Sequence, residues 1–417
     1  MAVLRSLMLG LTLALAACAS ARTATPAAAG ATEAREPVTI LVSIDGLRPD
    51  YLDRGFTPNL TALAAEGVRA QMRPAFPTKT FPNHQTLMTG LGPDTHGVVD
   101  NNMEDPRKPG IVFKTSNSEV SKPFWWDAAE PLWISAEKQG IRTGIVMWPG
   151  VGAPWGDLRP TAWMGYEEHI TSRQRTDTIL DWVRRPRSNR PRFLAVYFDA
   201  LDTAGHDYGP DSRETRAAMA ALDAEIGYLR RELAAMGQPA NLIVLSDHGM
   251  AATALERVIR IDRLIDAAAL HVVTDGPFMA LAPTPGREQE VERKLLGRHP
   301  HFECWRKSEL PARFRYGRNP RVQPLFCLAD HGWVLFARSP PKDFDIGNHG
   351  FDNEDPEMRA PFIAAGPGIA RAGSLPLFDN VDVYPFLAAL AGVKPLAHAG
   401  SAATLRPALR RRNGEPR

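Results

Sequence analysis

The sequence is short of long apolar runs, of any excess of charge and of cysteine. Beyond the N-terminus no stretch stays apolar for about 18 residues, so we expect no internal transmembrane helix. The 49 basic and 47 acidic residues give a formal net charge of +2, which is no reason to expect a nucleic-acid-binding patch or a charged membrane surface as partner. With 44% hydrophobic and 23% charged residues among 417, the composition is that of a globular chain of one large domain or two.

The N-terminal segment has the features of an export signal. Arg5 precedes the apolar run Leu7–Ala17, which ends in small residues, as secretory signals do. Its ending, Leu-Ala-Ala-Cys, resembles a bacterial lipoprotein box and would make Cys18 the lipidated first residue of the mature chain; ordinary signal cleavage nearby is the alternative. Residues 19–36 are rich in Ala and Thr and predict a flexible tether. We therefore expect an exported, periplasmic lipoprotein that meets the membrane only through a lipid on Cys18.

Only three cysteines are present. With Cys18 assigned to the signal, Cys304 and Cys327 remain. An exported chain enters an oxidising compartment, where these two can form a disulfide. Two buried free thiols explain them nearly as well, and their spacing does not decide.

Buried-type strands alternate with helices along most of the chain. Continuous apolar, β-branched runs predict strands buried on both faces of a parallel sheet, and four stand out: Val38–Ile44, Phe193–Phe198, Asn241–Leu245 and Pro361–Ala365. Helical patterns fall between these runs. The alternation predicts an α/β fold with a doubly wound, mostly parallel sheet that is flanked by helices.

We assign the main domain to residues 37–395. The composition changes once within this domain and once after it. Between about residues 270 and 340, short β-like runs and one helix, Glu288–Leu296, predict a smaller α+β insertion. Residues 396–417 form a basic C-terminal tail, and we expect its last part, Leu405–Arg417, to fray.

Three carboxylates and three imidazoles stand at predicted strand ends or in Gly-flanked loops: Asp45, Asp202, His206, Asp247, His248 and His349. Taken singly, each has an ordinary explanation, since Asp-Gly is a common turn and a lone His is usually a surface residue. Taken together, carboxylate oxygens and imidazole nitrogens without thiolates suit zinc or a similar divalent ion. Six such ligands and a nearby hydroxyl are too many for one tetrahedral ion and suit a pair.

The nearby hydroxyl belongs to Thr80, in the stretch Phe76–His84 between a predicted strand and a predicted helix that begins near Pro82. A Thr in this position is usually a helix N-cap. A helix N-terminus also favours phosphoryl oxygens, and a metal ion would lower the pKa of the hydroxyl and make it a nucleophile. Asn101 lies in an Asn-rich turn and has a side chain that can donate to a phosphate oxygen.

A set of short motifs stands along the chain: Ser43–Gly46, Phe76–His84, Thr89–Gly90 with Thr95–Gly97, Asp202–Pro210, Ser246–Met250 and Gly347–Gly350. Together they resemble the nucleotide pyrophosphatase/phosphodiesterase family of the alkaline-phosphatase superfamily. The resemblance covers about Val38 to Leu390 and implies an alkaline-phosphatase-like catalytic domain with two zinc ions. It assigns Asp45, Thr80, Asp247 and His248 to one ion, and Asp202, His206 and His349 to the other.

The same resemblance implies the reaction. Thr80 would be the covalent nucleophile, Asn101 would donate to a non-bridging phosphate oxygen, and Phe81 and Tyr197 would stack a nucleotide base. The chain would hydrolyse phosphodiester or phosphoanhydride bonds of nucleotide-like small molecules through a phospho-threonine. A phosphomonoesterase, a phosphonoacetate-type hydrolase or a lipid-headgroup phosphodiesterase is the alternative, but residues 151–171 hold no Lys-x-Arg pair to grip a dianionic monoester. A third hypothesis is a non-enzymatic lipoprotein that binds metal or phosphate. The sequence leaves the oligomeric state open.

Overall fold

The computed structural model describes residues 35–371 and 373–410. The predicted signal peptide, Cys18 and almost all of the predicted tether lie outside these residues, as does the end of the C-terminal tail. Within the described ranges, no helix combines the length and the apolar character needed to cross a membrane. The described residues from Glu36 onward form one compact unit.

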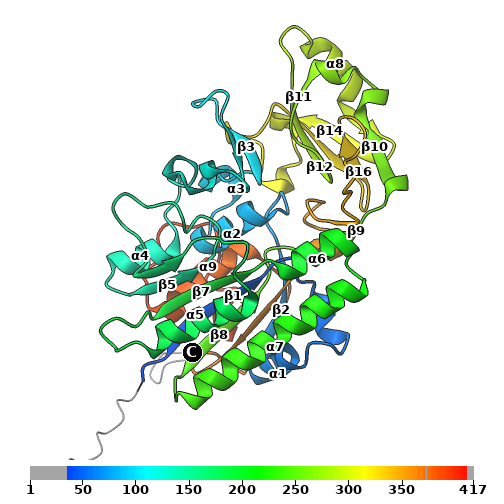
Figure 1. The fold of residues 1–417 in the computed structure, drawn as a ribbon. Coiled ribbons are helices and arrows are strands. Elements are labelled where there is room, and N and C mark those ends of the chain that lie inside the picture. Colours follow the sequence, from blue (N-terminus) through cyan, green and yellow to red (C-terminus); the bar gives the residue numbers. More distant parts are fainter. Residues whose placement is uncertain (1–34, 372, 411–417) are drawn as a thin grey trace, which may run out of the picture. The chain divides into compact units, whose positions relative to one another are not determined.

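A nine-stranded mixed sheet forms the centre of this unit (Figure 1). Its neighbouring strands follow the order β19 (Gly373–Ser374), β2 (Val68–Arg73), β18 (Ala360–Ala365), β8 (Ala240–Leu245), β1 (Val38–Ile44), β7 (Phe193–Phe198), β5 (Thr143–Val146) and β6 (Ala162–Met164), and β20 (Phe378–Asp379) pairs with β2. Strand β1 is parallel to both β7 and β8. Strand β18 runs antiparallel to β8 and β2. The predicted α/β class, mostly parallel and flanked by helices, is confirmed.

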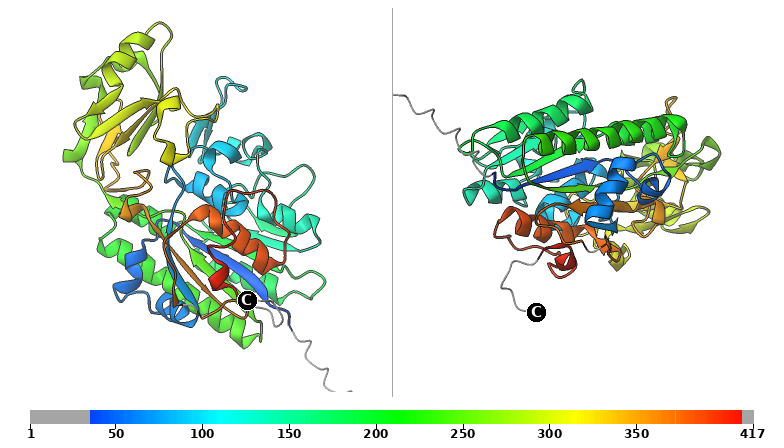
Figure 2. Two further views of the ribbon diagram at one scale, coloured as in Figure 1. Left: turned by 180° about the vertical axis from the view of Figure 1, so that it is seen from behind. Right: turned by 90° about the horizontal axis from the view of Figure 1, so that it is seen from below.

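Helices cover both faces of the sheet, as Figure 2 shows from below. One face carries α1 (Pro58–Glu66), α5 (Ser172–Arg184) and α7 (Arg213–Ala235); the other carries α2 (Thr80–Thr89), α4 (Leu132–Lys138) and α9 (Val383–Ala391). Strand β1 supplies both cores, because Ile40 and Val42 join the first core while Leu41 joins the second. Side chains of a strand alternate between faces, so a continuous apolar run is what this position requires.

The predicted α+β insertion is a second, antiparallel sheet. Its strands follow the order β11 (Leu270–Thr274), β12 (Phe278–Pro283), β15 (Leu325–Ala329), β14 (Phe302–Arg306) and β13 (Gly297–His299), with helix α8 (Glu288–Leu295) beside them. Cys304 and Cys327 face each other across β14 and β15 and form a disulfide. The alternative that the sequence left open is thereby decided in favour of the bond.

Short elements complete the main domain and the insertion. They include α3 (Pro93–His96), the hairpin β3 (Asn102–Glu104) and β4 (Val112–Lys114), α6 (Ala200–Tyr208), the pair β9 (Ala251–Ala252) and β17 (Gly347–Asn348), and the pair β10 (Val258–Arg260) and β16 (Val334–Phe336). The insertion leaves the main domain after β9 and returns to it at β17. Because β9 and β17 pair with each other, the two ends of the insertion lie side by side.

The expectation that the chain frays from Leu405 is wrong for the described part of the tail. Leu405 and Ala408 are buried in the core under the sheet. The backbone N–H of Ala370 donates to Ala408 and that of Arg410 donates to Gly368, each at 2.8 Å. Apolar side chains among the basic ones, with Leu409 also packed against this core, hold the segment together with these hydrogen bonds.

Candidate active site

The predicted ligands gather where three parallel strands end. Asp45 follows β1, and Asp247 and His248 come shortly after β8. Asp202 and His206 lie on α6, which follows β7. Because β1 lies between β7 and β8 and is parallel to both, their carboxyl ends meet at one edge of the sheet, which is where open α/β sheets bind ligands.

A glycine allows two of these strand ends to approach closely. Gly46 has φ of +68°, and a Cβ atom there would lie 3.1 Å from both the Cα and an Oδ atom of Asp202. Any other residue would meet both the strain of the left-handed region and this contact. The Asp-Gly pair therefore brings Asp202 next to Asp45 instead of forming a simple surface turn.

Thr80 is the first residue of α2 and does not cap it. Lys79 occupies the N-cap position, without a side-chain cap hydrogen bond. The Thr80 side chain is buried, and its Oγ1 lies 3.3 Å from Nε2 of His248. The N-cap interpretation of Thr80 is thus wrong, and the hydroxyl instead points at the predicted ligands.

The ligand atoms form two overlapping groups. In the first, Nε2 of His248 lies 3.3 Å from Asp45 Oδ1 and 3.0 Å from Asp247 Oδ2. In the second, the ligand atoms of Asp202, His248 and His349 lie within 4.8 Å of one another. His206 belongs beside this second group, because its Nε2 lies 3.4 Å from Asp202 Oδ2.

The three histidines among the predicted ligands make the same kind of hydrogen bond. Each ring places Nδ1 within hydrogen-bond distance of a backbone carbonyl: His206 with Gly347 at 2.9 Å, His248 with Gly249 at 3.0 Å, and His349 with Thr78 at 2.8 Å. A carbonyl can only accept, so Nδ1 carries a proton in each ring, and Nε2 is the nitrogen that faces the other predicted ligands. Outer hydrogen bonds of this kind fix the tautomer and aim of metal-binding histidines.

The carboxylates leave buried oxygens without partners. Asp45 Oδ1, Asp202 Oδ1 and Asp247 Oδ2 accept no hydrogen bond from the described residues. Burial raises the pKa of Asp45 well above its usual value, and the nearby Asp202 and Asp247 raise it further. Burial also lowers the pKa of His349 well below its ordinary value, which keeps that imidazole neutral. Crowded carboxylates and imidazole Nε2 atoms that face one centre fit divalent cations.

Asn101 lies beside the turn that carries Thr80. Its Oδ1 accepts a hydrogen bond of 2.9 Å from the backbone N–H of Phe81, the residue after Thr80. With Oδ1 engaged, the amide nitrogen is the remaining donor of the side chain. This arrangement fits the predicted donation to a phosphate oxygen.

The structure corrects the predicted role of Tyr197. Its hydroxyl donates to Asp45 Oδ2 at 2.5 Å, and its side chain is 8% exposed. A ring buried in the core beneath the ligands has no free face for a base. The aromatic pattern of β7 could not show that the Tyr197 hydroxyl faces Asp45, because the direction of the hydroxyl depends on the pairing of β7 with β1. Tyr197 instead orients Asp45.

Phe81 is partly buried and has ring contacts with Phe113 and Trp126, whose centroids are 5.9 and 5.8 Å away. A second partly accessible aromatic, Tyr166, was missed by the sequence reading. Tyr166 is 57% exposed, and its hydroxyl donates at 2.8 Å to Asp199, three residues before Asp202. Its position in a Trp- and Gly-containing loop gave no periodic signal from which to predict it.

His84 is a further buried residue near Thr80 that was not predicted to belong to the site. It lies one helical turn after Thr80, with Nδ1 2.8 Å from the Thr80 carbonyl and Nε2 2.9 Å from Ser43 Oγ. Its ring meets that of Tyr197 edge to face, with 4.9 Å between centroids. The i, i+4 spacing from Thr80 was the available signal.

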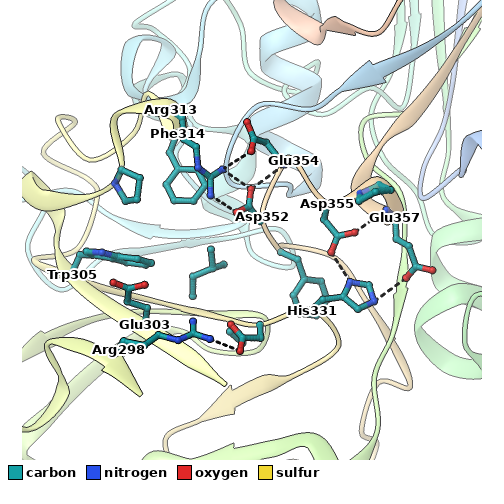
Figure 3. A pocket seen from close by; sticks show the side chains of 16 residues that line it. Arg298, Glu303, Trp305, Arg313, Phe314, His331, Asp352, Glu354, Asp355 and Glu357 are labelled. Carbon is teal, nitrogen blue, oxygen red and sulfur yellow. Dashed lines mark hydrogen bonds and ion pairs between the residues drawn. The ribbon is translucent and has the colours of Figure 1, made fainter. Parts of the chain in front are cut away.

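A cavity of about 760 Å³ lies away from these residues, between the insertion and the segment after His349 (Figure 3). Most of its charged side chains pair with one another. Arg298 bonds Asp330, Arg313 bonds Asp352, and His331 bonds Asp355. None of the predicted ligands lines it, so it is distinct from the candidate active site.

An alkaline-phosphatase-like fold with carboxylates, imidazoles and a hydroxyl gathered at one sheet edge defines a class of metal-dependent phosphoryl-transfer hydrolases. Comparison with known families narrows the class. The sequence model described as type I phosphodiesterase / nucleotide pyrophosphatase matches residues 39–352. The chain belongs to this family, and its membership supports a phosphodiesterase or pyrophosphatase activity.

Individual relatives are similar to this chain over nearly its whole length. An uncharacterized pyrophosphatase/phosphodiesterase of Schizosaccharomyces pombe is 36% identical over 396 residues, covering 91% of this chain and 81% of that protein. The bis(5'-adenosyl)-triphosphatase enpp4 of Xenopus laevis is 36% identical over 367 residues, covering 87% and 79%. Among solved structures, an inactive threonine-to-alanine form of murine ectonucleotide pyrophosphatase / phosphodiesterase 5 in complex with AMP matches with a TM-score of 0.86 and 34% identity, covering 90% of this chain and 100% of that one.

Proposed function

We propose that this protein is a two-zinc nucleotide pyrophosphatase/phosphodiesterase that acts through a phospho-threonine at Thr80. The observation that carries the proposal is that buried carboxylate oxygens without hydrogen-bond partners gather beside imidazole Nε2 atoms, one of which, on His248, lies 3.3 Å from the Thr80 hydroxyl. Asp45, Asp247 and His248 would hold one ion beside Thr80. A second ion would be held by Asp202, His206 and His349. When bound, the ions supply positive charge at the phosphoryl oxygens and favour the deprotonated hydroxyl.

The protein's own groups then perform two in-line displacements. Thr80 Oγ1 attacks phosphorus, the bond from phosphorus to the leaving oxygen breaks, and the hydroxyl proton leaves to solvent. Water next attacks the same phosphorus, the bond to Thr80 breaks, and Thr80 regains a proton. Asn101 would donate its amide N–H to a non-bridging oxygen throughout. Donors already held in place lower the barrier most where charge develops in the transition state.

The substrate class follows from the relatives and from the exposed aromatic rings. The names of the relatives refer to bis-adenosyl triphosphates and nucleotide pyrophosphates, and the AMP complex is of a related chain. Phe81 and Tyr166 offer ring surface near the nucleophile and near α6, and a nucleotide base can stack on such surfaces. A nucleotide diester or anhydride is therefore the proposed substrate.

Hydrolysis of a p-nitrophenyl ester of a nucleoside monophosphate, compared with p-nitrophenyl phosphate, tests the proposal. We expect the diester to be cleaved much faster, a chelator to abolish the activity, and zinc to restore it. Thr80→Ala is the matched control and should be inactive. Preferred cleavage of the monoester, or full activity in the chelated protein, would reject the proposed function.

We also propose export and anchoring through Cys18, from the N-terminal sequence pattern. The disulfide between Cys304 and Cys327 supports this compartment, because such bonds persist mainly in oxidising surroundings. Labelling of cells with radioactive palmitate should mark the full chain but not Cys18→Ser. Equal labelling, or the absence of label on the full chain, would contradict the lipid anchor.

A further inference from the structure

The insertion holds the segment that carries Asn101. Four of its side chains bond to residues 97–105, and they belong to His271, Thr274, Tyr316 and Arg321. Arg321 donates to the Gly97 carbonyl at 2.7 Å and, through Nε, to Asp105 Oδ2 at 2.7 Å. Tyr316 donates from its hydroxyl to the Val99 carbonyl at 3.1 Å. In Figure 1, β3, which follows Asn101 directly, lies beside β11 of the insertion. The insertion therefore acts as a scaffold for this segment as well as a separate sheet.

Another of these side chains, Thr274, reaches the residue just before Asn101. Thr274 Oγ1 donates to Asp100 Oδ2 at 2.6 Å, and both side chains are buried. The other oxygen of Asp100, Oδ1, accepts the backbone N–H of Asn101 at 2.7 Å. Since Asn101 Oδ1 accepts the N–H of Phe81, three consecutive hydrogen bonds link Thr274 to the residue after the nucleophile.

Strand β11 has a local irregularity at this point. The pairing of β11 with β12 shifts register between Val272 and Thr274. Bulges of this kind re-aim a side chain at the cost of a regular ladder. The side chain that follows the shift is the one that meets Asp100.

The carboxylate of Asp100 can link Thr274 rigidly to Asn101. A buried carboxylate is costly to leave unbonded, and hydrogen bonds to an ionised group are short and strong. Each Asp100 oxygen has its own donor, one from the insertion and one from Asn101. Loss of the Thr274 hydroxyl would leave Oδ2 unpaired and free the carboxylate to rotate, which would also disturb its bond to Asn101.

We propose that Thr274 is a positioning residue that acts through Asp100 to place the Asn101 amide for phosphoryl transfer. The inference rests on the proposed function, because it requires Asn101 to donate to the reacting phosphoryl group. It assigns the insertion a role in turnover that is separate from metal binding, since neither Thr274 nor Asp100 belongs to the ligand groups.

A double-mutant cycle tests this role on the zinc-loaded full chain with the p-nitrophenyl nucleotide diester. Removal of a transition-state donor typically costs about 100- to 1,000-fold in kcat, so we expect such a loss in Asn101→Ala. A displaced donor should cost less, about 10- to 100-fold in kcat for Thr274→Val, with KM and zinc content close to those of the unmodified chain. In the Asn101→Ala background, Thr274→Val should have no further effect on kcat, because residues that act through one another are not additive.

Two further variants make the result specific. Thr274→Ser keeps the hydroxyl and should restore kcat, whereas Thr284→Val removes an exposed hydroxyl elsewhere in the insertion and should leave kcat unchanged. If Thr274→Val does not fold, Asp100→Asn replaces it in the cycle, since its amide retains only one acceptor oxygen. Full additivity with Asn101→Ala, loss of zinc, or failure of Thr274→Ser to rescue would overturn the positioning role. An unmodified chain that hydrolyses no diester would instead reject the proposed function.

Discussion

Replacement of Tyr197 by phenylalanine distinguishes a residue that orients a ligand from one that stacks a base. The substitution keeps the ring and removes only the hydroxyl, which bonds to Asp45 Oδ2 at 2.5 Å. If Asp45 ligates zinc as proposed, loss of the Tyr197 hydroxyl should weaken zinc binding, because Asp45 is then no longer held by this hydrogen bond. A hydrogen bond to a charged group is worth about 1.5–3 kcal/mol, and loss of an outer-shell partner typically weakens metal binding by about 10- to 100-fold.

The assay is a zinc titration against a competing chelator, followed by turnover at low and high zinc. We expect Tyr197→Phe to bind zinc about 10- to 100-fold more weakly, and to recover most of its kcat when zinc is in excess. KM for a nucleotide diester should change little, because the ring has no exposed face.

The chain offers a matched control for this substitution. Tyr228 donates its hydroxyl to Asp177 at 2.9 Å on the protein surface, so Tyr228→Phe removes the same kind of bond far from the ligands. Zinc affinity in Tyr197→Phe equal to that in Tyr228→Phe would refute the reasoning. The hydroxyl of Tyr197 would then be irrelevant to the metal, and Asp45 would have to be oriented in some other way.

Three other expectations follow from the contacts. Thr80→Ala should abolish turnover while about two zinc ions per chain remain; loss of metal or retained turnover would contradict the assigned role. Joint replacement of Cys304 and Cys327 by alanine should lower the free energy of unfolding by about 3 kcal/mol, the loop-closure value for a crosslink of this span, with turnover preserved; an unchanged denaturation midpoint would contradict it. The hydrogen bond to Asp355 raises the pKa of His331 to about 10, so the protonated ring stabilises the fold fully below its unfolded pKa of about 6.5. His331→Gln should therefore destabilise the chain in mild acid, with the difference fading as the pH rises through about 10; a difference in denaturation midpoint that does not vary with pH would argue against it.

The central sheet and much of the ligand set could be predicted because they depend on local sequence. A continuous apolar run such as Val38–Ile44 indicates a strand buried on both faces, and a polar residue directly after it must lie at the edge of the sheet. The structure brings Asp45 and Asp247 to that edge as expected. Their assignment as metal ligands remains a prediction.

Contacts that depend on strand register or on a bulge could not be predicted. The disulfide requires Cys304 and Cys327 to face each other, and only the pairing of β14 with β15 sets that register. Tyr197 was misassigned for a similar reason, since its residue type fits stacking while its neighbours in the sheet direct the hydroxyl to Asp45. Thr274 gave no signal at all, because the register shift in β11 turns an ordinary strand residue towards Asp100.

The proposed zinc ligands and the proposed phosphate-binding residue Asn101 are held in place by different parts of the fold. Asp45, Asp247 and Asp202 belong to the connections that leave the central sheet, so the geometry of the ligands is set by strands buried on both faces. Asn101 belongs to a loop whose backbone and neighbouring side chain are held by the insertion. A rigid core tolerates small displacements poorly, whereas a loop held by a few hydrogen bonds can be adjusted by changing its anchors. Substitutions at the contacts between the insertion and residues 97–105, such as Thr274→Val, should therefore alter turnover without altering zinc affinity.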